Sequence, residues 1–292
     1  MSEQGSAGGG VPVSSRRMAR RLLAGAGAAE VTAYRHAGAE ALAVMHALDE
    51  DGRVIVAAHP RQGHPLAEAL DGEVVEVRLD VTLEAAEPSL RVTSATAHLL
   101  GLLTWLDAEE TALVLAGETA GCHCPITGED PLEGLGLLAQ VPGGRLGVVT
   151  AERVMVHDAM GVSAHAMDAV VDAECAEAPS LLWNDLDSVT AQEEVRELGD
   201  AALTLLCESV VEGRLPGVLC SHRPAEGLCP SLYGRVLCAD VAPDGVTLMH
   251  VSPTCVQTVQ VWLPSGTRRA CEVGPFLRGC VQEALLEDLL RG

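Results

Sequence analysis

Residues 74–83, VVEVRLDVTL, alternate regularly between apolar and polar side chains from Val75 onward. Every second residue is a valine or a leucine, and the residues between them include Glu76, Arg78 and Asp80. A period of two is typical of a β-strand that buries one face and exposes the other. Residues 74–83 are therefore predicted to form a half-buried strand.

Segments of similar character lie on both sides of this strand. The acidic turn Asp49-Glu50-Asp51-Gly52 separates two apolar segments, which predicts a hairpin. We expect strands at residues 31–36, 40–46, 54–58, 74–83, 90–106 and 145–157. Helices are expected at residues 15–24 and 65–70. Antiparallel strands at this spacing favour a small barrel.

The pattern changes after His165. Short helical periodicity at 166–176 is followed by a break at Ala178-Pro179 and by the longest amphipathic pattern of the chain, residues 187–211. Strands are expected next, and a helix closes the chain; these segments are 232–241, 246–251, 256–263 and 274–290. The predicted fold class is α+β. A disordered tail (1–13) precedes a barrel domain (14–176) and a smaller helix–sheet–helix domain (177–292).

Composition excludes several kinds of function. The 292 residues carry 41 acidic and 19 basic side chains, a net charge of −22, and every basic residue is an arginine. A chain without lysine has no Schiff-base lysine and no P-loop lysine. The negative charge and six aromatic residues argue against binding to nucleic acid or to an anionic membrane. Because no apolar run approaches about 20 residues, we expect a soluble protein. Residues 15–24 are interpreted as an amphipathic helix and not as an export signal, so we expect the protein to be cytoplasmic.

Two cysteine groups raise the question of metal binding. They are Cys122-His123-Cys124 and the segment that holds Cys220, His222 and Cys229. Neither has the C-x₂-C spacing of zinc knuckles, so a site would need both segments together. The alternative is that these cysteines bind no metal. In either case we expect the ten cysteines to stay reduced and not to form a disulfide framework.

An anion site is predicted where a strand leads into a short helix. His59, Arg61 and His64 cluster there, and backbone amides next to an arginine can bind a phosphate or a carboxylate. The alternative is an ordinary polar loop. Arg78 and Arg91 on neighbouring strands are further candidates, and their alternative is pairing with nearby carboxylates.

Several segments together resemble a known family. They are the arginine-bearing helix RRMARRLLA (16–24), the hairpin at 49–56, GLLTWL (101–106) and RVMVHDAMGV (153–162). In order and spacing they resemble the FMN-binding split-barrel proteins related to pyridoxine 5′-phosphate oxidase. The C-terminal part is similar to the domain appended in the haem-utilisation, haem-degrading split-barrel family. The resemblance implies a homodimer that holds haem or FMN at the subunit interface.

Three functions follow from the resemblance. The first is haem binding, with oxidative haem degradation left open. The second is a non-catalytic regulator or interaction protein without a cofactor, and the third is an FMN-dependent oxidoreductase. Imidazole is a natural axial ligand for haem iron, so His98 and above all His250 are candidate ligands. The predicted cofactor-binding residues are His59, Arg61, His64, Arg78, Arg91, His98 and His250.

Overall fold

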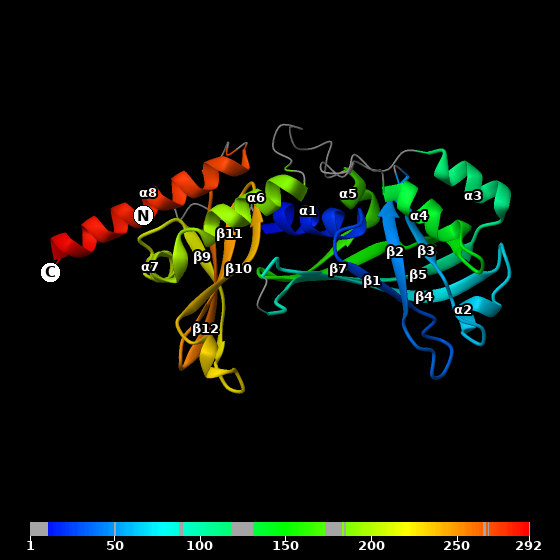
Figure 1. Cartoon of the computed structure of the whole chain (residues 1–292), viewed down its shortest axis with the longest axis horizontal. Helices are drawn as coiled ribbons and strands as arrows, with labels where there is room; N and C mark the ends of the chain where they lie inside the picture. The colour runs from blue at the N-terminus through cyan, green and yellow to red at the C-terminus, as the bar shows by residue number, and fades with distance from the viewer. Residues whose placement is uncertain are drawn as a thin grey trace, which may run out of the picture. The chain divides into compact units, whose positions relative to one another are not determined.

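The computed structural model describes residues 11–49, 51–87, 90–117, 131–172, 183, 185–264, 267 and 269–291. Within them the chain forms two compact units, an antiparallel barrel and a smaller sheet with helices (Figure 1). The barrel unit uses the described residues up to 83 and those within 95–158 and 162–176. The second unit uses those within 84–94, 159–161 and 177–292. The predicted α+β split barrel with a second domain is confirmed as a fold class.

Six strands close the barrel. They are β1 (Ala28–Thr32), β2 (Leu42–Leu48), β3 (Val54–Ala58), β4 (Val74–Glu84), β5 (Thr93–Trp105) and β6 (Arg145–Thr150). Their order is β4-β1-β2-β3-β6-β5, and the pairing of β5 with β4 completes the circle. Two further strands continue the sheet beyond β5, namely β7 (Arg153–Asp158) and β8 (Gly161–Ala166).

The burial of the β4 side chains follows the alternation of the sequence. Val75, Val77, Leu79 and Val81 are buried in the barrel core, and the residues between them lie on the outer face. β1 pairs with both β2 and β4, so its buried Val31 faces the same interior. The helix α1 (Val11–Leu23) adds Leu22 and Leu23 to this core; it begins four residues earlier than expected.

The barrel splits where β5 changes partner. Leu102–Trp105 of β5 pairs with β6, whereas Thr96–Leu99 pairs with β7. Gly101 lies between these two stretches, and a Cβ atom there would lie 2.5 Å from the carbonyl oxygen of Thr150. The close approach of the β6–β7 corner to β5 therefore requires a residue without a side chain at position 101.

Four short helices belong to this unit. They are α2 (Pro65–Glu68), α3 (Ala108–Leu115), α4 (Pro131–Gln140) and α5 (Met167–Val171). α4 covers the outer side of β2, β3 and β6, where its Leu132 and Leu135 pack on Ile55 and Ala57. Figure 1 shows α5 beside α1, and Arg20 of α1 donates a hydrogen bond to the carbonyl of Val171 at 2.7 Å. The barrel therefore has one helix-covered side.

The second unit is a four-stranded antiparallel sheet with helices on one face. Its strands are β9 (Gly217–Pro224), β10 (Arg235–Ala242), β11 (Gly245–Val251) and β12 (Cys255–Trp262), in the order β10-β11-β12-β9. The helices are α6 (Asp185–Arg196), α7 (Gly199–Val211) and α8 (Val273–Arg291), with the short turns η3 (Pro230–Leu232) and η4 (Ala270–Glu272). Valines and leucines of both layers form its core.

Two sequence expectations for this unit were wrong. The helix expected over 187–211 is two helices, because Gly199 takes a φ of +78° and breaks the first helix. Asp200 then accepts a hydrogen bond from the backbone nitrogen of Val236 at 2.9 Å. The sheet has four strands rather than three, because β9 is an edge strand without the alternation that reveals a half-buried strand. None of the described helices is both long and apolar enough to cross a membrane.

Candidate functional site

Polar side chains gather on the outer face of β4, β5 and β7. Each strand buries alternate residues in the core, so the residues between them point outward. The outward residues on this face include Arg78, Asp80, Thr96, His98, Leu100, Met155 and His157. Strand alternation and the pairing of β5 with β4 and β7 together place basic, acidic, imidazole and apolar groups side by side.

Asp80 joins two of the predicted site residues. Its Oδ1 lies 2.6 Å from Nδ1 of His98, and its Oδ2 lies 2.7 Å from Nε of Arg78. Asp80 is one-fifth exposed and His98 two-fifths exposed, so both can be reached from solvent. Since a carboxylate only accepts hydrogen bonds, Nδ1 of His98 is the donor.

The other nitrogen of His98 faces the remaining polar groups. Its Nε2 lies 3.3 Å from the Thr96 hydroxyl, and its ring meets the ring of His157 edge-on with centroids 5.2 Å apart. Thr96 lies two residues before His98 on the same face of β5, and the register sets Thr96 directly opposite His157, which makes His98 and His157 diagonal neighbours. With Nδ1 protonated, a neutral His98 carries its lone pair on Nε2, the atom that ligates a metal.

A histidine oriented by a carboxylate is the usual arrangement of a metal-ligating imidazole. No group of three or more histidine, cysteine or acidic side chains suited to a bare metal ion occurs within the described part of the chain. An iron that brings its own four porphyrin nitrogens needs only one or two protein ligands. A single imidazole that a carboxylate orients is a donor set that fits haem iron.

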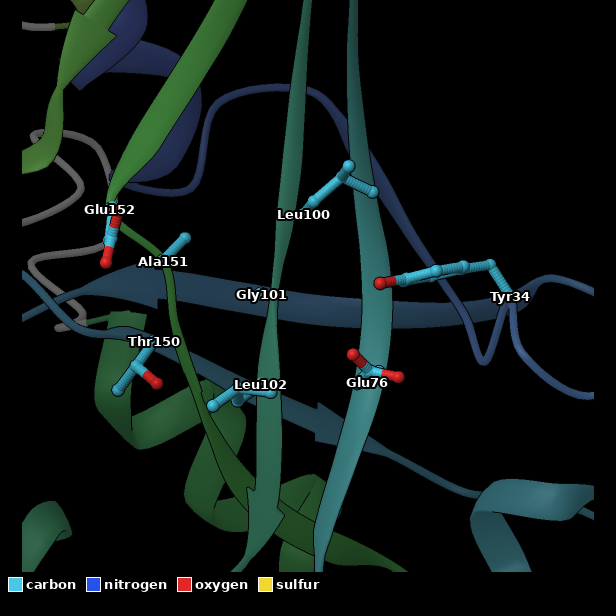
Figure 2. A pocket seen from close by; sticks show the side chains of 8 residues that line it. All are labelled: Tyr34, Glu76, Leu100, Gly101, Leu102, Thr150, Ala151 and Glu152. Atoms are coloured by element: carbon cyan, nitrogen blue, oxygen red, sulfur yellow. The ribbon is translucent and has the colours of Figure 1, made fainter.

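A hollow of about 450 Å³ lies on the same unit, at the split of the barrel (Figure 2). Its lining is Tyr34, Glu76, Leu100, Gly101, Leu102, Thr150, Ala151 and Glu152. At its rim Arg35 forms an ion pair with Glu76, with Nε and Oε2 2.8 Å apart, and lies 5.4 Å from the ring centre of Tyr34. The Glu76 pair raises the pKa of Arg35.

Most barrel arginines that could bind a flavin phosphate are already paired with carboxylates. Five of those available from the sequence form ion pairs with carboxylates: Arg35 with Glu76, Arg53 with Asp49 and Asp51, Arg78 with Asp80, Arg91 with Glu84, and Arg145 with Asp71. An FMN phosphate would have to compete with these carboxylates for each cation. Pairing with carboxylates, the alternative considered for Arg78 and Arg91, is what the structure contains.

The loop of His59, Arg61 and His64 is occupied with local contacts. Nε2 of His59 lies 2.9 Å from the carbonyl oxygen of Pro142, and Nε2 of His64 lies 3.1 Å from that of Glu40. Nδ1 of His64 accepts a hydrogen bond from the backbone nitrogen of Leu66 in the four-residue helix α2. The side chain of Arg61 is exposed. These contacts are typical of a structured polar loop, and an anion site there stays a prediction.

The other candidates lie in the second unit or outside the described residues. His250 is on β11, and its Nδ1 is buried without a hydrogen-bond partner among the described residues. Cys220 contacts the sulfur of Met160, whereas the exposed Cys229 accepts from the Ser231 hydroxyl, which lowers its pKa. Cys122 and Cys124 lie outside the described residues. None of the seven cysteines within the described residues forms a disulfide.

Sequence reasoning identified Arg78 and His98 but missed what connects them. Asp80 appeared only as a partner for an arginine, and Thr96 and His157 were not singled out. The strand alternation places all five on outer faces, yet it does not show which strands are neighbours. That information comes from the pairings of β5 with β4 and β7.

Fold and site together define a class: an antiparallel split barrel with a second α+β unit and a carboxylate-oriented histidine on the outer barrel face. No protein-family model and no curated protein matches the chain. Among solved structures it is similar to a heme binding protein from Mycobacterium smegmatis, with 12% identity, a TM-score of 0.45, and coverage of 94% of this chain and 98% of the other.

A second similar structure is a protein of unknown function from Agrobacterium tumefaciens. The identity is 17% and the TM-score 0.34, over 90% of this chain and 94% of the other. At these values neither likeness establishes a function for this chain.

Proposed function

We propose that this chain binds haem on the outer face of the barrel, with Nε2 of His98 as an axial ligand of the iron. The observation that carries the proposal is the 2.6 Å contact between Asp80 and Nδ1 of His98. It holds the imidazole in the tautomer that ligates iron and makes it a stronger ligand.

The surroundings of His98 suit a large apolar ring. Met155 is directly opposite His98 in the β5–β7 register, and Leu100 is two residues further along β5 on the same face. Their exposed fractions are 45% and 64%, so both have apolar surface to cover. Bound haem would supply iron-centred redox chemistry, and this chain would supply the ligand, its orientation and the apolar contact.

His157 is the second imidazole within reach of the site. Its ring centre lies 5.2 Å from that of His98, and both rings project from the outer face. His157 would lie beside a haem held by His98, and both haem carriage and haem degradation stay open. The FMN alternative has less support, since the barrel arginines listed above pair with carboxylates.

Titration of the purified protein with haemin, followed by absorption, tests the proposal. The wild type is expected to develop a Soret band and His98→Ala to lose at least tenfold in affinity, while His250→Ala binds like the wild type. Asp80→Asn replaces the charged acceptor of Nδ1 by a neutral amide oxygen and is expected to weaken binding about 10- to 100-fold.

The opposite pattern would contradict the choice of ligand. If His250→Ala loses the Soret band and His98→Ala keeps it, the ligand is in the second unit. A protein that leaves the absorption spectra of free haemin and free FMN unchanged would support the non-catalytic regulator instead.

A further inference from the structure

The hollow at the split of the barrel is a second place where the chain can bind a small molecule. We infer that it takes an organic cation, a primary amine or guanidine attached to an apolar body. The inference goes beyond haem binding: the hollow shares Leu100 with the haem proposal, but none of its lining residues is His98, Asp80 or His157.

The size and the apolar walls come first. A volume of about 450 Å³ lies within the range of roughly 300–1,000 Å³ that small-molecule sites occupy. Leu100, Leu102 and Ala151 line it, and the two leucines are 64% and 43% exposed. Figure 2 shows Leu102 and Ala151 on the side of the hollow away from Tyr34. A ligand here would cover apolar surface that otherwise faces water.

The charges of the lining select the ligand. Two of the eight lining residues, Glu76 and Glu152, are acidic and none is basic. Glu76 is satisfied by Arg35, whereas Glu152 is exposed and has no ion pair among the described residues. An incoming ammonium group can therefore pair with Glu152 without displacing a cation. The net charge of −22 further favours cations over anions.

At the rim, a carboxylate and an aromatic ring already bind a cation of the chain itself, the guanidinium of Arg35. The guanidinium of Arg35 contacts both oxygens of Glu76, at 2.8 and 3.3 Å, and lies 5.4 Å from the ring centre of Tyr34. A carboxylate and an aromatic face together are the usual surroundings of a bound organic cation. The hydroxyls of Tyr34 and Thr150 add acceptors for its N–H groups.

A matched series of three probes tests the inference by calorimetric titration of the haem-free protein. Phenethylamine, phenethyl alcohol and phenylpropionate share an apolar body and differ in charge. The amine is expected to bind most tightly and the carboxylate most weakly. Binding of the amine should weaken as NaCl rises from about 50 to 500 mM, because exposed charges are screened.

Variants place the binding in the hollow. Glu152→Gln is expected to lower the affinity for the amine about fivefold and to leave the affinity for the alcohol unchanged. Leu100→Ser should weaken both. Glu109→Gln, the same change on the exposed first turn of α3, should alter neither. His98→Ala should also leave the amine unaffected, so this result is independent of haem binding.

Three results would overturn the inference. One is equal affinity for the alcohol and the amine, and another is an affinity for the amine that Glu152→Gln does not change. The third is no binding of the amine at millimolar concentration, since a site of this size and charge would then have no preference for cations.

Discussion

At the scale of single residues, the chain uses the two faces of one strand for different purposes. On β4, Leu79 and Val81 fill the barrel core, while Asp80 between them orients His98 and holds Arg78. Because a strand turns successive side chains to opposite faces, core and site can share one stretch of ten residues without competing. Residues 74–83 thus contribute side chains both to the barrel core and to the candidate site.

A buried histidine makes the stability of the barrel depend on pH. His46 is 6% exposed, and its Nε2 lies 2.7 Å from the carbonyl oxygen of Leu22, which joins β2 to α1. Burial lowers the pKa of His46. Below about pH 6.5, the ordinary pKa of histidine, the unfolded chain binds a proton that the native protein does not take up. The free energy of unfolding therefore decreases as the pH is lowered below this value.

The prediction compares the wild type with His46→Gln, which keeps a donor for Leu22 and removes the titration. Between pH 7 and pH 5, the stability of the wild type relative to the variant is expected to fall by up to about 1.4 kcal/mol per pH unit. Urea denaturation at several pH values measures it. A constant difference across this range would show that His46 does not contribute.

At the scale of elements, the split of the barrel depends on Gly101. Gly101→Ala brings a Cβ atom against the backbone oxygen of Thr150, which is not the end of a flexible side chain and cannot rotate away. We expect a loss of about 1–3 kcal/mol in the free energy of unfolding. Gly134→Ala on α4 is the control, because a Cβ there meets only the flexible end of Met45 and alanine favours a helix.

Thermal and urea denaturation of both variants check this prediction. Gly134→Ala should be as stable as the wild type or more stable by up to about 1 kcal/mol. Equal stability of Gly101→Ala and the wild type would mean that β5 can shift away from the β6–β7 corner.

Elements with a regular pattern could be predicted, and elements defined by their neighbours could not. Residues 74–83 and 54–58 alternate or are continuously apolar, and both are strands. β9 was missed because most of its residues are exposed, and the break at Gly199 because the amphipathic pattern continues across it. The site follows the same rule: His98 could be predicted as a candidate ligand from its residue type, but its position on the outer face and its pairing with Asp80 depend on the neighbouring strands.

At the scale of the whole molecule, the homodimer expected from the sequence stays a prediction. Leu100, Leu102 and Met155 are each at least 43% exposed on the outer barrel face, and a second copy would remove them from water. A haem on this face would then also lie between two copies. Light scattering of the purified protein is expected to give twice the mass of the chain.

Two matched substitutions place the interface. Leu100→Glu should yield a monomer, whereas Leu137→Glu, which changes a leucine of similar exposure on α4, should leave the dimer intact. If the wild type is a monomer with and without haemin, or if both variants behave alike, the outer face of the barrel is not the dimer interface.

Rescue of a His98 variant by free imidazole tests whether His98 is the ligand of the iron. His98→Gly removes the imidazole and leaves room for a free one on the outer face. With haemin bound, we predict that the variant has an altered Soret band and that added imidazole restores the wild-type spectrum. A variant whose spectrum equals that of the wild type before any imidazole is added would contradict the account, because His98 would then not be a ligand of the iron.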